Sequence, residues 1–148
     1  MLGGAVHFFD EGKNSWSLLK DKVAMGPYHN IARYNLVHKV VVFGAGNGSK
    51  ALYRLDAPGN VARLKDAPFP VRISSTVTAV DPATGDLLVL NMEDKHRFHA
   101  LDVKANAWRR LPDTPISEGV AAPIGGHGVT LFFLHRPPRV FLYKHCAP

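Results

Sequence analysis

The segment RFHALD at residues 97–102 is followed after a short turn by WRRL at residues 108–111. This stretch pairs a short apolar segment that ends in Asp with a second short segment that begins with Trp and ends in Leu. Similar pairs occur twice earlier in the chain, as ALYRLD with VARL at residues 51–64 and as AVHFFD with WSLL at residues 5–19. The chain therefore contains an internal repeat, which has to be identified before single motifs are interpreted.

The copies of this repeat are regularly spaced, because Asp10, Asp56 and Asp102 are each 46 residues apart. A weaker fourth copy, VFLYK at residues 140–144, begins 42 residues after Phe98. A period in the forties is shared by β-propeller blades and by some helical solenoids. The type of secondary structure therefore decides between the two architectures.

Short apolar runs bounded by turn residues favour strands over helices. VVVF at residues 40–43 and LLVL at residues 87–90 are such runs, and turn signals recur in GAGNGS at 44–49 and DPATG at 81–85. The best helical candidate, residues 16–25, coincides with a repeat position that has strand character in the other copies. With 13 Gly and 11 Pro the chain has little room for long helices, and the sequence predicts an all-β protein.

These features resemble the kelch-repeat β-propellers, a family that includes the galactose-oxidase type. The resemblance rests on LD at residues 101–102, WRRL at residues 108–111 and the Pro-containing loop PDTP at residues 112–115, and it covers nearly the whole chain. Val61 departs from the pattern, because it stands where the family has Trp. The resemblance implies four-stranded blades whose first strand lies nearest the central axis.

On this resemblance, residues 1–148 form one partial β-propeller of about three kelch-like blades. Its parts are two outer strands of a preceding blade at 1–19, blade one at 31–65, blade two at 74–111 and an incomplete blade three at 120–145. The chain then starts and ends within a blade, which leaves an apolar sheet face and a strand edge uncovered at each end. We expect either a longer chain or head-to-tail self-association of two copies that closes the ring.

The composition indicates a soluble globular domain of 148 residues, with 46% hydrophobic and 20% charged residues. The net charge is +6, but the 18 Lys and Arg are spread along the chain, so we predict no nucleic-acid partner. No apolar run is long enough to span a bilayer and no signal peptide is visible, so we predict no membrane partner and a cytoplasmic location by default. The single cysteine, Cys146, cannot form an intramolecular disulfide.

The chemistry-bearing residues do not select a reaction. The glycine-rich GAGNGS at 44–49 leads into a further strand rather than a helix, so a hairpin turn is favoured over a phosphate loop. His96 and His99 are three residues apart, a spacing that places them on opposite faces of a strand. We therefore predict no metal and no cofactor, and we assign no catalytic residue, although a Ser–His–Asp set assembled from distant residues is left open.

The resemblance to kelch propellers implies that a ligand binds at the mouth, among the loops that enter the inner strands and the loops that join second to third strands. The candidate ligand-binding residues in or near these segments are Tyr28, His29, Asn30, Arg33, Tyr34, Asn47, Arg72, His96, Glu118 and Arg136. Such a ring of Arg, His and Asn suits an acidic peptide or a sugar, and polar residues are also the ordinary surface of loops.

We expect a non-catalytic recognition scaffold that binds a protein or carbohydrate ligand at the propeller mouth. The alternative is half of a kelch-type propeller enzyme that acts on carbohydrates, of the oxidase or sialic-acid epimerase type. Fold alone does not choose between the two functions. Bound metal, or titratable groups with shifted pKa values at the mouth, would favour the enzyme.

Overall fold

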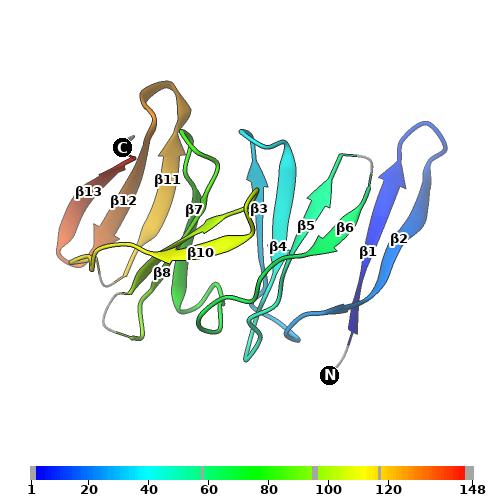
Figure 1. Ribbon diagram of the computed structural model, residues 1–148, viewed down its shortest axis with the longest axis horizontal. Coiled ribbons are helices and arrows are strands. Elements are labelled where there is room, and N and C mark those ends of the chain that lie inside the picture. The colour runs from blue at the N-terminus through cyan, green and yellow to red at the C-terminus, as the bar shows by residue number, and fades with distance from the viewer. Residues whose placement is uncertain (1–2, 58, 95–96, 117, 146–148) are drawn as a thin grey trace.

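The computed structural model describes residues 3–57, 59–94, 97–116 and 118–145. These residues form 13 β-strands arranged in four small antiparallel sheets, which confirms the all-β prediction. Figure 1 shows the sheets side by side along the molecule, in the order in which they occur in the sequence. In the part of the chain that is described, no helix has the length and apolar character needed to cross a membrane.

The first sheet is the hairpin of β1 (Gly3–Asp10) and β2 (Ser15–Ala24). The segment with the best helical composition, residues 16–25, is therefore strand over nearly its whole length. Tertiary contacts explain this outcome, because Val23 is buried against Tyr53 of the second sheet. The backbone N–H of Ala24 also donates to Tyr53 Oη at 3.0 Å.

The second sheet has the order β3-β4-β5-β6 and is formed by Ile31–Asn35, Val40–Gly44, Leu52–Asp56 and Val61–Arg63. Gly46 lies in the loop that follows β4 and has a φ of +96°. A Cβ added there would lie 2.8 Å from the carbonyl oxygen of Tyr28. The glycine-rich stretch therefore permits a close approach of two loops, and it leads from one strand to another as predicted.

The third sheet has the order β7-β8-β9-β10 and is formed by Thr76–Val80, Leu87–Asn91, Phe98–Asp102 and Ala107–Arg110. Every residue of β7 and β8 is buried, because neighbouring sheets cover both faces. A strand covered on both sides has no polar face, which explains the unbroken apolar run of β8.

The fourth sheet has the order β11-β12-β13 and is formed by Val120–Ile124, Val129–His135 and Pro138–Lys144. A 3₁₀ turn at Gly125–His127 joins its first two strands. On one face of this sheet, Phe132 and Leu134 pack against the third sheet. This contact uses only that face, so the other face lies at one end of the molecule in Figure 1.

Apolar clusters join each sheet to the next. The first and second sheets share the cluster around Val23, and the second and third share a larger cluster that includes Val42 and Leu101. The third and fourth share a cluster that includes Leu88 and Phe132. The first strand of the third sheet, β7, contacts both β3 and β11, so the first strands of three successive sheets are neighbours.

The repeated Trp joins two neighbouring sheets in the third copy of the repeat. Trp108 on β10 packs against the cluster between the second and third sheets, and its Nε1 donates to the Lys65 carbonyl oxygen at 3.1 Å. The N–H of Lys65 in turn donates to Asn106 Oδ1 at 2.6 Å. Trp108 therefore joins the third sheet to the second sheet by packing and by a hydrogen bond.

Candidate functional site

Because successive strands are antiparallel, the connections between them lie alternately at the two opposite ends of the strands. We call the edge formed by residues 25–30, 45–51 and 64–75 the loop edge, and the edge formed by residues 36–39, 81–86 and 103–106 the turn edge. The N-terminal end of β1 lies at the loop edge, at the bottom of Figure 1.

Backbone hydrogen bonds connect the segments of the loop edge. The N–H of Asn47 donates to the Tyr28 carbonyl oxygen at 3.1 Å, and the N–H of Ile73 donates to the His29 carbonyl oxygen at 3.1 Å. The structure therefore brings together five of the predicted ligand-binding residues, which are Tyr28, His29, Asn30, Asn47 and Arg72.

The polar groups of these residues are mostly bonded within the chain. His29 Nδ1 lies 2.9 Å from Asn47 Oδ1. The Asn30 amide, in the orientation that satisfies both partners, donates to the carbonyl oxygens of Ala45 at 2.8 Å and Gly26 at 3.2 Å.

Arg72 is also engaged within the loop edge. Its Nε donates to Ser75 Oγ at 2.8 Å, and its Nη2 donates to the carboxylate of Glu93. The hydrogen bond to Glu93 raises the pKa of Arg72. Together with the bonds of His29 and Asn30, these contacts stabilise the loops and leave fewer groups for a ligand.

The other predicted residues lie apart from this group. Arg33 donates from Nε to the Thr78 carbonyl oxygen at 3.2 Å and so connects β3 to β7. Tyr34 lines a cavity of about 140 Å³ near the turn edge. Glu118 precedes β11 and the exposed Arg136 lies between β12 and β13, while His96 lies outside the described residues.

The loop edge also contains a cavity of about 570 Å³. Of the predicted ligand-binding residues, Asn47 lines this cavity. Its charged side chains have partners inside the chain, because Lys50 Nζ donates to the Pro68 carbonyl oxygen at 3.1 Å and Arg63 pairs with Asp66 at 2.8 Å. This cavity therefore offers mainly apolar surface, together with one ion pair and one ammonium group that is already hydrogen-bonded.

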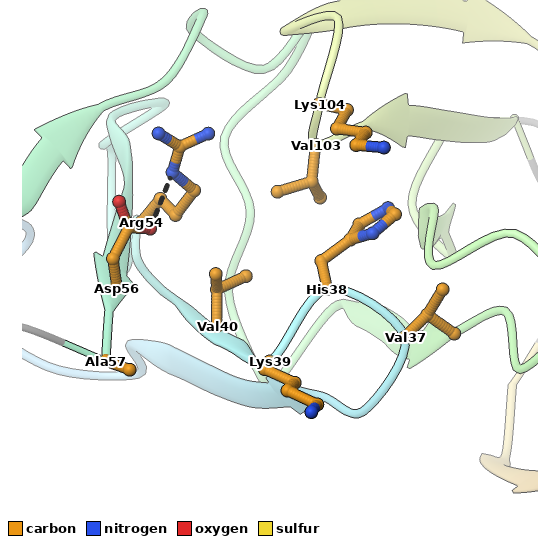
Figure 2. Close-up of a pocket in the computed structure, with 9 residues that line it drawn as sticks. All are labelled: Val37, His38, Lys39, Val40, Arg54, Asp56, Ala57, Val103 and Lys104. Carbon is orange, nitrogen blue, oxygen red and sulfur yellow. Dashed lines mark ion pairs between the residues drawn. The ribbon is translucent and has the colours of Figure 1, made fainter.

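The turn edge holds a cleft of about 450 Å³ between the second and third sheets, shown in Figure 2. The β3–β4 turn, the end of β5 and the β9–β10 turn supply its lining, which consists of Val37, His38, Lys39, Val40, Arg54, Asp56, Ala57, Val103 and Lys104. None of these residues belongs to the predicted set. The sequence points to this part of the molecule in one way. The repeated Asp, as at Asp56 and Asp102, marks the end of a strand at the turn edge.

The cleft combines an apolar centre with basic groups. Figure 2 shows His38 and Lys104 on one side and Arg54 with Asp56 on the other, with Val40 and Val103 between them. Arg54 Nε lies 2.9 Å from Asp56 Oδ1, close enough for an ion pair but not aligned as a hydrogen bond.

The amines of Lys39 and Lys104 carry the uncompensated charge of the cleft. Within the described part of the chain, neither amine makes an ion pair or a hydrogen bond. Since Asp56 already pairs with Arg54, the cleft is left with a net positive charge and can attract an anion.

The local backbone explains how His38 is held in the cleft. Asn35 Oδ1 accepts the backbone N–H groups of Val37 at 3.1 Å and His38 at 3.0 Å, and this closes the β3–β4 turn. The His38 ring then lies against Gly85, where an added Cβ would be 2.6 Å from His38 Nε2. A glycine at this position therefore allows the ring to sit where it does.

A second cavity of about 480 Å³ adjoins the cleft and shares His38 and Lys104 with it. Its Arg109 donates from Nη2 to Asp86 Oδ2 at 2.6 Å, and this hydrogen bond raises the pKa of Arg109. Burial raises the pKa of Tyr143, which is also hydrogen-bonded to Arg109. Arg109 is therefore already paired with Asp86 and contacts Tyr143 of the fourth sheet.

Beside this network, Asp81 is a buried carboxylate whose Oδ2 has no hydrogen-bond partner among the described residues. His145 Nδ1 lies 3.7 Å from this oxygen, which permits an ion pair when the imidazole is protonated. No group of three or more His, Cys, Asp or Glu side chains is placed to hold a metal ion in the described ranges.

Comparison with known proteins adds no family to these observations. No model of a protein family matches the sequence, and no curated protein matches it. The site is therefore interpreted from its own geometry.

Proposed function

We propose that the chain is a segment of a kelch-like β-propeller that acts as a non-catalytic recognition scaffold. Two observations support the propeller. The second and third sheets each contain four strands that are adjacent in both sequence and space, and their first strands, β3 and β7, are neighbours. The kelch label rests on the sequence pattern around Trp108.

We further propose that this scaffold binds an acidic segment of a partner protein in the cleft of Figure 2. The observation that carries this proposal is the unpaired amine of Lys104 beside His38, over the apolar surface of Val40 and Val103. A carboxylate can pair with the amine while its aliphatic stem packs on the two valines.

The loop edge supports binding less well. Its Asn30 and Arg72 side chains already bond to neighbouring loop groups, and a ligand would have to displace those bonds. Breaking an intramolecular hydrogen bond costs free energy. A ligand that pairs with the amine of Lys104 does not have to break one. The predicted ring at the loop edge stays a prediction, and Arg72→Ala is its direct test.

The experiment is fluorescence anisotropy with a labelled pentaglutamate peptide at low ionic strength. Lys104→Ala is expected to weaken binding by about threefold to tenfold, which is the range for one partly exposed charged contact. Lys20→Ala, which removes an exposed lysine from β2, is the matched control and should leave the affinity unchanged.

Three results would contradict the proposal. These are no binding by the wild type, equal effects of Lys104→Ala and Lys20→Ala, and weaker binding in Arg72→Ala alone, which would move the site to the loop edge. Binding of glucuronic acid with no binding of the peptide would replace the protein ligand by a carbohydrate.

A further inference from the structure

The outer face of the fourth sheet is a continuous apolar surface. The strand register aligns Val120, Phe133 and Val140 in one row across β11, β12 and β13, and directly opposite residues point to the same side of a sheet. A second row consists of Ala122, Leu131 and Leu142. We call these six positions the β11–β13 face.

Large side chains of this face are exposed to solvent, with Val140 at 59% and Leu142 at 67%. The repeat gives the comparison, because the equivalent positions of β9 in the third sheet are Phe98 and Ala100. Those two residues are buried against the fourth sheet, with exposures of 6% and 0%. The β11–β13 face is thus the same kind of surface without the sheet that covers it elsewhere.

The opposite end of the molecule has a second uncovered face on the β1–β2 hairpin. Phe9 and Trp16 are directly opposite in the register and their rings are 5.1 Å apart. Leu18 lies two residues further along the same side of β2. We call these three positions the β1–β2 face, and Trp16 in it is 69% exposed.

The repeat also shows what this second face would normally contact. Trp108 is the equivalent of Trp16 and packs on the cluster shared with the preceding sheet. Val61 holds the same position in the second sheet and packs with Val23 of the first sheet. Two of the three equivalent residues therefore cover a preceding sheet, and Trp16 has the same side chain without that sheet.

We propose that the β11–β13 face of one copy packs on the β1–β2 face of a second copy, head to tail. The partner is a second copy because these two faces are the two unmatched halves of a contact that already occurs between successive sheets. In a pair of copies each molecule offers both faces, so the two contacts close a ring. Two contacts bury twice the area of one, which favours a stable pair.

This proposal is independent of the ligand in the Figure 2 cleft, and its test is solution mass by light scattering on a size-exclusion column at several concentrations. The wild type is expected at twice the chain mass of 16.2 kDa. Leu142→Lys and Trp16→Lys each damage both contacts of a ring made from identical copies, so each variant alone is expected to be monomeric. Circular dichroism checks that both variants keep the strand content of the wild type.

Mixing the two variants separates a head-to-tail pair from any symmetric one. The intact β1–β2 face of Leu142→Lys can still meet the intact β11–β13 face of Trp16→Lys, so the mixture is expected to regain a pair that contains both variants. Leu36→Lys changes an equally exposed apolar residue of the β3–β4 turn, on neither face, and should remain paired.

A wild type that is monomeric at every concentration would overturn the proposal. Further repeats of a longer chain would then be the candidates that cover the two faces. A variant that stays paired on its own would also overturn it, because the contact would then join two identical faces. A mixture that remains monomeric would do the same.

Discussion

Asn35 Nδ2 donates a 2.7 Å hydrogen bond to the carbonyl oxygen of Gly85, so the β3–β4 turn is tied to a turn 50 residues later in the chain. The Asn35 side chain is completely buried and its Oδ1 accepts two backbone N–H groups. One amide therefore closes its own turn and also joins the second sheet to the third. This junction holds the wall of the cleft that contains His38.

Asn35→Ala is expected to lower the free energy of unfolding by about 2–3 kcal/mol, since it leaves the buried Gly85 carbonyl and the part-buried N–H groups of Val37 and His38 without their partner. Urea denaturation followed by circular dichroism measures the change. Asn60→Ala, at an exposed turn position, is the matched control and should change stability by less than about 0.5 kcal/mol. Equal effects of the two variants would show that the junction does not hold the sheets together.

Gly85→Ala tests the close approach between Gly85 and His38. Gly85 has a φ of +80° and its added Cβ would press on the His38 ring, so we expect a loss of about 2–3 kcal/mol in unfolding free energy. Gly48→Ala is the control, because Gly48 has a φ of +71° but open space around it, and should cost only about 1 kcal/mol. A Gly85 effect no larger than the Gly48 effect would mean that the ring moves aside without cost.

Trp108→Phe keeps an aromatic ring on the cluster but removes the hydrogen bond to the Lys65 carbonyl oxygen. We expect a loss of about 0.5–1 kcal/mol, because that oxygen can bond to water instead. Trp108→Ala removes the packing as well and should cost about 2 kcal/mol or more. Thermal unfolding at a fixed protein concentration compares the two, and equal losses would show that packing contributes nothing.

His99 predicts a pH dependence of stability. Burial lowers its pKa below the ordinary value, with further lowering from Arg110 and Arg97. The unfolded chain therefore binds a proton more readily than the folded one at mildly acidic pH. The stability that His99 contributes is complete above its ordinary pKa of about 6.5 and falls as the pH drops from there towards the lowered folded value.

His99→Gln is expected to flatten the fall in unfolding free energy below pH 6.5, as measured by urea denaturation at a series of pH values. A profile that is the same in His99→Gln and the wild type would assign the pH dependence to other groups.

Several features could be predicted from the sequence because they depend on local pattern. The apolar run of β8 and the turn residues around it predict a buried strand, and the spacing of Asp10, Asp56 and Asp102 predicts strands that end at matching places. The all-β class follows from these patterns. The segment 16–25 has a composition that suits a helix, but its position in the repeat predicts a strand, and the buried contact of Val23 with the second sheet stabilises that strand.

The candidate site could not be predicted in the same way. His38 and Lys104 come from two different turns and Arg54 comes from β5, and no spacing in the sequence connects the three residues. The predicted Asn30 and Arg72 do lie together at the loop edge, but their bonds to neighbouring groups are visible only in the folded chain.

The repeat, the all-β class and the positions of the turns follow from the amino-acid sequence, because they depend on residues that are close together in the chain. The folded chain alone shows which polar groups are already bonded and where a basic cleft lies. It also shows that Trp16 is exposed while Trp108 packs against the second sheet. The physical reason is that the two tryptophans have similar local sequences, whereas burial depends on whether another sheet lies against the face that carries them.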